Sequence, residues 1–311
     1  TVNFSSTSFY FPDQKRPGKG TADKILIDDG GVIYMTPSSY TTCSMNNPDW
    51  EFSSSETILY RDSDRGHAYN IFMKYKGIPV LYSPFISFPL SRERHSGFLL
   101  PSVGSSGESG TVLSTPYYFN LSENFDLTFT PTNYSGRGQM LEAEFRHKSE
   151  KSNTTIELAN LNDDNIYRKN RHAYFIRDAR TYKNTLKQQA DIWKGTIISS
   201  NINIGGISDI NYFDDFSNTV SRVGRTHITR DIKLERLDYN DLGYFKTSIA
   251  ATDYQLAKQD LQEQYSVLPR LKFEYQSKKT DRNFNYNFNG EIADFDHTLP
   301  HKVTGLRMIL Y

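Results

Sequence analysis

The sequence lacks any long hydrophobic run. Hydrophobic residues make up 37% of its 311 residues and charged residues 23%. A helix that crosses a bilayer needs about 20 consecutive, mainly apolar residues, and no stretch of the sequence approaches this length. The composition therefore excludes a helical membrane protein. The mean hydropathy of −0.62 is still compatible with a membrane barrel, because barrel strands face lipid only with alternate residues.

Cysteine and net charge are scarce too. Cys43 is the one cysteine, so its thiol is either free or bonded to a cysteine outside this sequence. The 36 basic residues balance the 36 acidic ones, which is not the electrostatic footprint of a nucleic-acid-binding protein. Residues 1–10 lack the basic start and apolar core of a signal peptide. We therefore expect a fragment of a longer protein, with no nucleic acid among its partners.

Motifs for catalysis and metal binding are missing as well. The seven histidines show no zinc-ligand spacing, and neither a G-x-S-x-G motif nor a P-loop is present. Carboxylates two residues apart do occur, as in Glu142 and Glu144, but a polar strand face needs such residues without catalysis. We expect no catalytic residue, metal or cofactor, and a protein that is not an enzyme.

What the sequence does contain is a hydrophobic period of two. Leu141, Ala143 and Phe145 alternate with charged residues, which indicates a strand with one apolar and one polar face. About eleven such segments follow Gly110, near residues 110–121, 124–134, 138–148, 153–162, 171–183, 193–208, 224–237, 243–256, 267–278, 283–296 and 302–311. Their lengths suit the ~9–11 residues of a tilted membrane strand, so we predict part of an antiparallel transmembrane β-barrel. Bacterial barrels have even strand numbers, which again favours a fragment.

The first hundred residues differ, with shorter and less regular strand-like runs such as residues 24–27, 57–60 and 67–76. This pattern favours a small β domain, a sandwich or jelly roll, with a packed interior. Gly and Ser dominate residues 102–110 and suggest a boundary there. We therefore predict an all-β chain with a partial jelly-roll domain at residues 1–105 and a partial barrel at residues 106–311.

One long motif resembles a known family. Residues 77–100 read GIPVLYSPFISFPLSRERHSGFLL and are followed by Pro101. The run is similar to the segment that leads from jelly roll to barrel in the LptD family of lipopolysaccharide-assembly proteins. The resemblance implies a periplasmic jelly roll followed by an outer-membrane barrel of about 26 strands. It also implies transport and insertion of lipopolysaccharide (LPS) into the outer leaflet, with outer-membrane lipids, the barrel plug lipoprotein LptE and the periplasmic bridge protein LptA as partners.

The resemblance assigns roles to three residues. Pro116 and Pro131 match prolines that weaken the seam between the first and last barrel strands, the lateral gate; a strand end or bulge without gating is the alternative. Cys43 matches a jelly-roll cysteine that forms a disulfide with a cysteine near the end of the family's barrel. Such a bond suits the oxidising periplasm, whereas a buried inert thiol is the alternative.

A lipid path is implied less specifically. The apolar residues of the predicted jelly roll are by default its core, but the family uses such residues as a groove for acyl chains; the candidates are Ile78, Val80, Phe85, Ile86 and Phe88. Arg92, Arg94 and His95 are candidates for contact with lipid headgroup phosphates, and a solvated domain junction is equally compatible with them.

Other functions remain open from the residues alone. An outer-membrane porin or receptor, or a lipid-modifying barrel enzyme, would share the strand pattern. An enzyme needs a nucleophile and a base within hydrogen-bond reach, for which no local motif exists. A soluble adhesin would have polar exposed faces instead of a recurring apolar one.

Overall fold

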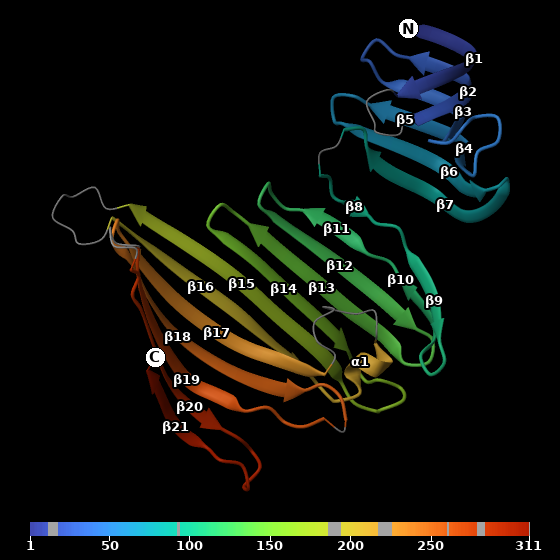
Figure 1. The fold of residues 1–311 in the computed structure, drawn as a ribbon. Helices are drawn as coiled ribbons and strands as arrows, with labels where there is room; N and C mark the ends of the chain where they lie inside the picture. Colours follow the sequence, from blue (N-terminus) through green and yellow to red (C-terminus); the bar gives the residue numbers. More distant parts are fainter. Residues whose placement is uncertain are drawn as a thin grey trace. The chain divides into compact units, whose positions relative to one another are not determined.

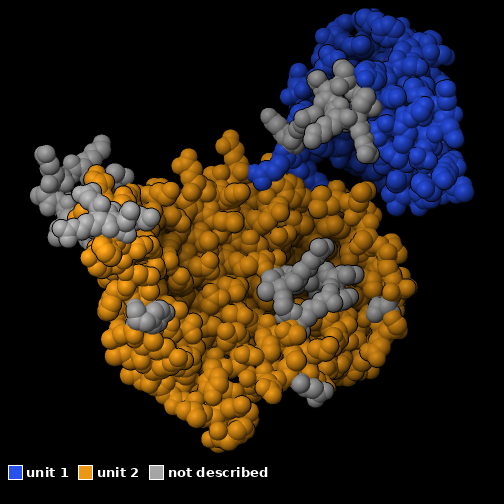
Figure 2. Space-filling view, in the orientation of Figure 1, with its two compact units in different colours: residues 1–97 blue, residues 98–311 orange. Residues whose placement is uncertain are grey.

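In the computed structural model, residues 1–11, 18–91, 94–185, 194–216, 226–259, 261–278 and 284–310 are described. Within them the chain is almost entirely β-strand, with antiparallel pairing throughout, which confirms the predicted all-β fold (Figure 1). None of the described helices is long and apolar enough to span a membrane. The chain forms two compact units, residues 1–97 and 98–311 (Figure 2). This division precedes the Gly/Ser-rich stretch at residues 102–110, which forms a hairpin instead of a linker.

Unit 1 contains seven strands in its described part. These are β1 (Val2–Phe11), β2 (Gly18–Ile27), β3 (Ile33–Tyr40), β4 (Trp50–Ser54), β5 (Glu56–Tyr60), β6 (Arg65–Tyr75) and β7 (Ile78–Pro89). Strand β3 pairs with β2, β4 and β5, and β6 pairs with β4, β5 and β7. The core of buried Ala22, Ile25, Met35 and Leu59 is small. Phe88 of β7 packs against this core.

Unit 2 is one large antiparallel sheet, with β9 and β21 as the outermost strands of its main path (Figure 1). After β8 (Gly97–Phe98), where the units divide, its described strands are β9 (Ser102–Ser106), β10 (Gly110–Ser114), β11 (Tyr117–Asn120), β12 (Phe125–Tyr134), β13 (Gly138–Lys148), β14 (Ser152–Leu161), β15 (Arg171–Thr185), β16 (Gly195–Ile207), β17 (His227–Tyr239), β18 (Gly243–Leu256), β19 (Ser266–Ser277), β20 (Asn287–Asp296) and β21 (Gly305–Leu310).

The predicted strands agree closely with this sheet, and the bounds of β13 and β18 match the predicted ones. Two differences occur. The predicted strand at residues 110–121 is split into β10 and β11, and residues 102–106 form the unpredicted strand β9. The sheet also carries one short helix that the sequence did not predict, α1 (Tyr212–Asp215).

The sheet has an apolar and a polar face. Leu234, Ile249, Leu271, Ile292 and Met308 lie opposite one another in a row across β17 to β21. Leu234 and Ile249 are 49% and 48% exposed. Because neighbours along a strand point to opposite faces, the next row presents the other face. There, Glu235, Ser248, Lys272 and Glu291 lie opposite one another in the same way.

Charged pairs stabilise the polar face. The Glu235 carboxylate contacts the ammonium groups of Lys233 at 2.6 Å and Lys246 at 3.3 Å. The Lys272 ammonium lies 3.0 Å from Glu291. These residues are partly exposed, so each pair is worth only about 0–1 kcal/mol. What distinguishes the two faces is therefore solvent preference, since one face carries exposed hydrocarbon and the other exposed charge.

The two ends of the sheet also differ. We call the end from which β9 starts the junction end, because the chain enters the sheet there after unit 1. Its fully described connections are 121–124, 149–151 and 240–242. The opposite end, which we call the cluster end, carries α1 and a buried core of Tyr134, Met140, Ala159, Leu161, Ala173, Phe175, Ile207, Tyr212, Phe213, Phe216, Ile228 and Ala257.

Candidate functional site

Pro116 and Pro131 lie close together in the sheet, at the place where pairing is interrupted. Strand β10 ends at Ser114 and β11 begins at Tyr117, so Pro116 lies in the break between them. Pro131 lies within β12 and pairs with Leu141 of β13. Ser114 pairs with Thr132, so the next residues along the two strands, Thr115 and Pro131, are neighbours. The structure thus brings both predicted prolines to one spot.

Each proline leaves one bond of this ladder unmade. The Thr115 N–H donates to the Pro131 carbonyl at 3.1 Å, and the Leu99 N–H donates to the Pro116 carbonyl at 2.9 Å. In an antiparallel hydrogen-bonded pair the second residue donates back to the first. Proline has no N–H, so neither return bond can form. Each missing bond removes about 0.5–1.5 kcal/mol of net stabilisation.

A third proline, Pro101, belongs to the same spot but was not among the predicted site residues. It lies in the break between β8 and β9. Ser102 pairs with Ser114 and the Leu99 N–H donates to the Pro116 carbonyl, so one strand advances three residues where the other advances two, and Pro101 lies within this irregularity. Pro101 and Pro116 therefore lie in strand breaks, next to Pro131 in the continuous strand β12. Cross-strand register was needed to see this, and the sequence alone does not provide it.

The cluster end holds a buried ionic group that the sequence did not reveal. Its members, which we call the arginine cluster, are Arg137, Arg171, Asp164, Asp209 and Asp215. Both arginine side chains and that of Asp164 are fully buried. Asp164 accepts from Arg137 at 3.0 Å and from Arg171 at 3.2 Å. Asp215 likewise accepts from Arg137 at 2.6 Å and from Arg171 at 2.5 Å, while Asp209 pairs with Arg171 through two hydrogen bonds of 2.8 and 2.9 Å.

The cluster joins three connections that are far apart in sequence. Arg137 belongs to the β12–β13 turn, Asp164 to the β14–β15 loop, and Asp215 to the segment after β16. The Arg171 guanidinium also lies over the rings of Tyr167 at 4.5 Å and Phe216 at 4.7 Å. Removing one partner of a buried ion pair typically costs about 3–5 kcal/mol. We infer that the cluster fixes the loops at this end of the sheet.

Two carboxylates of the cluster, Asp164 and Asp209, are held in their charged form. Burial alone raises the pKa of Asp164, but hydrogen bonds from the Ile166 N–H and from both arginines outweigh burial and leave that pKa below its usual range. Asp209 is similar. Its pKa is raised by burial but lowered overall by hydrogen bonds from Ser208 and Arg171.

The segment Ser208–Phe216 owes its fold to this cluster and to aromatic packing. Tyr212, Phe213 and Phe216 are buried in the core at the cluster end, and the Phe216 ring lies 5.4 Å from that of Tyr134. The aromatic and acidic residues of this segment are visible in the sequence, but Asp215 pairs with Arg137, which is 78 positions away. No local pattern encodes such a contact.

The residues of the predicted lipid path all lie on β7 but do not share one face. Ile86 pairs with Ala68 and Phe88 with Gly66, on the side that packs against the small core of unit 1. Phe85 lies on the other face, where its ring contacts His67 and Tyr69, both at 5.3 Å. The remaining two candidates are strongly exposed, Ile78 at 66% and Val80 at 57%.

The predicted headgroup residues are only partly described, since Arg92 lies outside the described residues. Arg94 is exposed. His95 is engaged within unit 1, because its Nε2 lies 2.9 Å from a carboxylate oxygen of Asp64. A hydrogen bond from Ser91, followed by contact with His95, keeps the pKa of Asp64 below its usual range despite some burial. The ionised Asp64 therefore competes with any phosphate for His95.

Cys43 is half-buried and unbonded. It follows β3, where its backbone N–H donates to the Thr41 hydroxyl at 3.0 Å. That hydroxyl in turn donates to the Trp50 carbonyl at 2.6 Å. The cysteine thus lies on an ordered turn of unit 1, and its thiol remains available to a partner.

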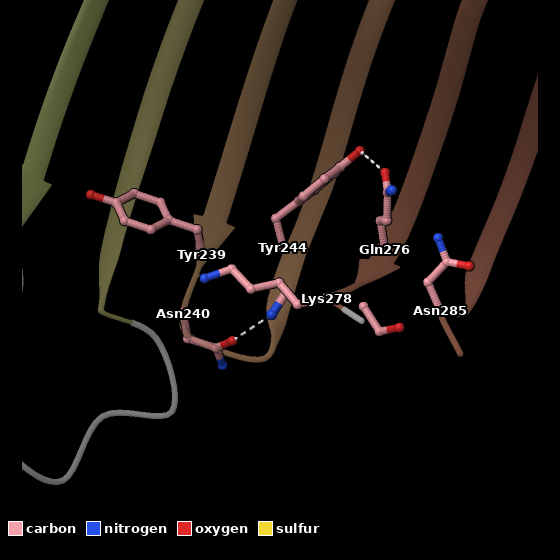
Figure 3. Close-up of a pocket in the computed structure, with 8 residues that line it drawn as sticks. Tyr239, Asn240, Tyr244, Gln276, Lys278 and Asn285 are labelled. Carbon is pink, nitrogen blue, oxygen red and sulfur yellow. Dashed lines mark hydrogen bonds between the residues drawn. The ribbon is translucent and has the colours of Figure 1, made fainter. Parts of the chain in front are cut away.

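A shallow hollow of about 350 Å³ lies at the junction end, lined by Tyr239, Asn240, Gly243, Tyr244, Gln276, Ser277, Lys278 and Asn285 (Figure 3). The Tyr244 hydroxyl points to Gln276 and donates to it at 2.8 Å (Figure 3). All lining residues except Gly243 have a side chain with a polar group, in keeping with the face of the sheet on which Tyr244 and Gln276 lie opposite each other.

Comparison with known proteins shows that the sequence is similar to one protein family. The family model LptD, described as LPS transport system D, matches residues 169–311. The LPS-assembly protein LptD of Hahella chejuensis is 31% identical over 278 residues, and that of Pseudoalteromonas atlantica is 30% identical over 279 residues. These alignments cover 88% and 90% of this chain, but only 34% and 35% of those relatives.

A third relative extends the alignment further. The LPS-assembly protein LptD of Thiobacillus denitrificans is 28% identical over 95% of this chain and 38% of its own length. The chain therefore spans little more than a third of the length of the relatives it matches. The matches run through both units, and the family model falls on strands of the large sheet. Together they show that the chain belongs to the LptD family.

Proposed function

We propose that this chain is part of a protein that assembles LPS in the outer membrane by transport, without catalysing a reaction. The observation that carries the proposal is the two-faced sheet of unit 2, with exposed apolar rows on one face and charged rows on the other. A transmembrane barrel needs this arrangement, with lipid outside and water or a polar plug inside. Membership of the LptD family supports the choice of LPS as the cargo.

The sheet then forms the first part of a barrel wall. Most of its strands from β12 to β20 are 10–15 residues long, enough for the ~9–11 residues of a tilted membrane strand. The polar face lines the lumen and offers charged rows to a plug such as the lipoprotein LptE. The apolar face meets outer-membrane lipid.

The orientation follows from chain connectivity. If unit 1 is periplasmic, as in a jelly roll that receives LPS from LptA, the junction end of the sheet is periplasmic. The cluster end, on the other side of the wall, then faces outward. The segment Ser208–Phe216 with its arginine cluster closes over the outer end of the wall.

The lateral gate lies at the prolines of β8 to β12. Pro101, Pro116 and Pro131 weaken pairing in the first strands of the wall, where lipid must leave between the first and last strands. A gate must open without unfolding the rest of the barrel. The missing ladder bonds of Pro116 and Pro131 serve this purpose, because they lower the cost of separating the first strands. Pro269 also interrupts pairing in β19, but it lies far along the sheet from these strands.

Unit 1 supplies the route to the gate. Ile86 and Phe88, with Ile78, Val80 and Phe85 on the exposed parts of β7, offer apolar surface to acyl chains. Arg94, which is exposed, and His95, whose Nε2 contacts Asp64, are the described candidates for a headgroup contact. Cys43, on its ordered turn, is available for a disulfide with a cysteine beyond this chain.

The gate is tested in the full-length protein by replacing Pro116 and Pro131 with alanine. The double variant regains two N–H donors, so the first strands pair more tightly with one another and part less easily at the gate. Less LPS then reaches the cell surface, and large antibiotics enter the cell more readily. Pro300→Ala, in the connection between β20 and β21, is the matched control. Normal surface LPS and normal antibiotic exclusion in a stably folded double variant would contradict the gate.

A further inference from the structure

The apolar face carries a charged triad near the junction end. Asp178 of β15 is 8% exposed at its side chain and lies directly opposite Thr154 of β14. The Thr154 hydroxyl donates to Asp178 at 2.5 Å, and the Arg180 guanidinium donates to the same carboxylate through Nε at 2.9 Å and Nη2 at 3.3 Å. Asp178 and Arg180 alternate along β15 with residues of the polar face, so they share the apolar face with Ile176.

The same triad recurs two strands further along the sheet. Asp238 of β17 is 7% exposed at its side chain and lies directly opposite Thr196 of β16. Thr196 donates to it at 2.6 Å, and Arg236 donates through Nε at 2.9 Å and Nη2 at 3.0 Å. Alternation places this triad on the same face as Leu234. Two neighbouring hairpins have thus built one arrangement of a threonine, a buried aspartate and an outward arginine.

Both triads include a residue close to the junction end of its strand. Thr154 lies near the start of β14, which begins at Ser152, and Asp238 is the next-to-last residue of β17, which ends at Tyr239. Tyr182, two residues beyond Arg180 on the same face, is 48% exposed. Tyrosine is enriched where membrane hydrocarbon meets water. In a barrel wall these positions correspond to the headgroup level at the junction end.

The aspartates fix the orientation of the arginine side chains but bind only some of their N–H donors. Aspartate occupies Nε and Nη2 of each guanidinium, and Arg180 also forms a hydrogen bond with Tyr182, yet the side chains of Arg180 and Arg236 remain 49% and 58% exposed. A guanidinium has five N–H donors in a planar fork, so its outer edge can still take a second anion. The buried carboxylate fixes the direction of that edge, and phosphate is the anion that fits it by bidentate bonding.

Stability alone does not account for these triads. Ion pairs on an apolar surface cost desolvation, and replacing such pairs by hydrophobic residues is often neutral or stabilising. A charged pair that recurs with the same atoms on an otherwise apolar face needs another use. We propose that each triad binds the phosphate of a lipid headgroup and that this binding positions the wall in the bilayer. This inference rests on the proposed function.

Two lipids supply such a phosphate at a barrel surface, namely a phospholipid and the lipid A part of LPS. Native mass spectrometry of the full-length protein distinguishes them. The protein is delipidated in detergent and titrated separately with dioleoyl phosphatidylglycerol, lipid A and phosphate-free dioleoylglycerol. The test variant is Arg180→Gln with Arg236→Gln. The control is Arg177→Gln, whose arginine neighbours Arg180 in sequence but lies on the polar face, paired with Glu157 at 2.7 Å.

We expect the test variant to retain about tenfold less phosphatidylglycerol than the wild type, from the loss of charge-assisted hydrogen bonds, with dioleoylglycerol binding unchanged. The control retains wild-type levels. A loss confined to lipid A would support the phosphate site and assign it to LPS. Equal retention of both phosphorylated lipids by test and control variants would overturn the inference.

Two further measurements keep the outcome clear. If the glutamine variant fails to fold, as judged by heat-modifiable gel migration, Arg180→Lys with Arg236→Lys replaces it. Lysine keeps the charge but lacks the fork, so retention should still fall several-fold, and wild-type retention would contradict the site. Separately, Leu158→Trp on the apolar face reports membrane contact through quenching by brominated lipid. An unquenched Trp refutes the proposed function itself, whereas quenching with unchanged lipid retention refutes only the phosphate site.

Discussion

Two regions of the same sheet are paired very differently. Between β15 and β16, residues from Ala173 to Thr185 pair without a shift, and β17 and β18 pair over the same length. In contrast, β9 to β12 are joined by short ladders of five, three and four residue pairs, with prolines at the breaks. The two regions also differ in sequence, because β9 and β10 are short and rich in Gly and Ser, whereas β15 and β16 are long. Short strands and the N–H groups that proline removes therefore both contribute to the contrast.

This contrast indicates how a wall can be both firm and able to open. The long ladders hold β13 to β18 together, and the arginine cluster locks their outer connections. The interrupted ladders weaken the first strands, and a second irregularity occurs at Pro269 in β19. Substitutions that weaken the firmly paired region or strengthen the interrupted one test whether the contrast has a function.

The largest effect is expected from the arginine cluster. Arg171→Ala leaves Asp209 without its arginine and Asp164 and Asp215 with Arg137 alone, so the free energy of unfolding should fall by about 3–5 kcal/mol. Loss of heat-modifiable migration at a lower temperature measures the effect. Arg177→Ala, on the same strand but partly exposed, serves as the control. Equal melting of the two variants would show that the cluster does not lock this region.

A charge on the apolar face comes next. Ile249→Arg, near the middle of β18, should cost about 2–4 kcal/mol if that side chain faces hydrocarbon. Ser248→Arg, the adjacent residue on the polar face, should be nearly neutral. Folding yields into lipid vesicles, compared by urea titration, measure the difference. Similar penalties for both variants would place neither face in lipid.

A smaller effect is expected at Pro131. Pro131→Ala provides an N–H opposite Thr115 and should stabilise the pairing of β10 with β12 by about 0.5–1.5 kcal/mol. Hydrogen exchange of the Thr115 amide should slow accordingly. Unchanged exchange would mean that the break has a cause other than the missing donor.

Acid provides the mildest test. The pKa of Asp164 is lowered in the folded protein, so its charge stabilises the fold above the ordinary carboxyl pKa of about 3.9. That stabilisation is lost only as the pH falls below this value, through the lowered pKa. Thermal stability should therefore vary little through this group from pH 7 to 5 and decline below about pH 4. Asp164→Asn should weaken that decline, and an unaltered acid profile in this variant would exclude Asp164 as its source.

Sequence reasoning predicted the regular parts of the molecule well. Alternation located β13 and β18 to the residue, because one apolar and one polar face leave a period of two that is read directly. It did not predict the split of residues 110–121, since proline marks a possible break without showing what lies opposite. It also missed the arginine cluster and α1. Arg137 and Asp215 meet only because intervening hairpins return the chain to the same end of the sheet.

Hydrogen–deuterium exchange of the full-length protein in lipid nanodiscs tests the central claim most directly. If the prolines weaken the first strands, amides of residues 99–115 should exchange about tenfold faster than those of β15 and β16, as expected for one or two missing bonds. Replacing Pro101, Pro116 and Pro131 together by alanine should largely remove that difference. Equal protection of both regions in the unaltered protein would contradict the account.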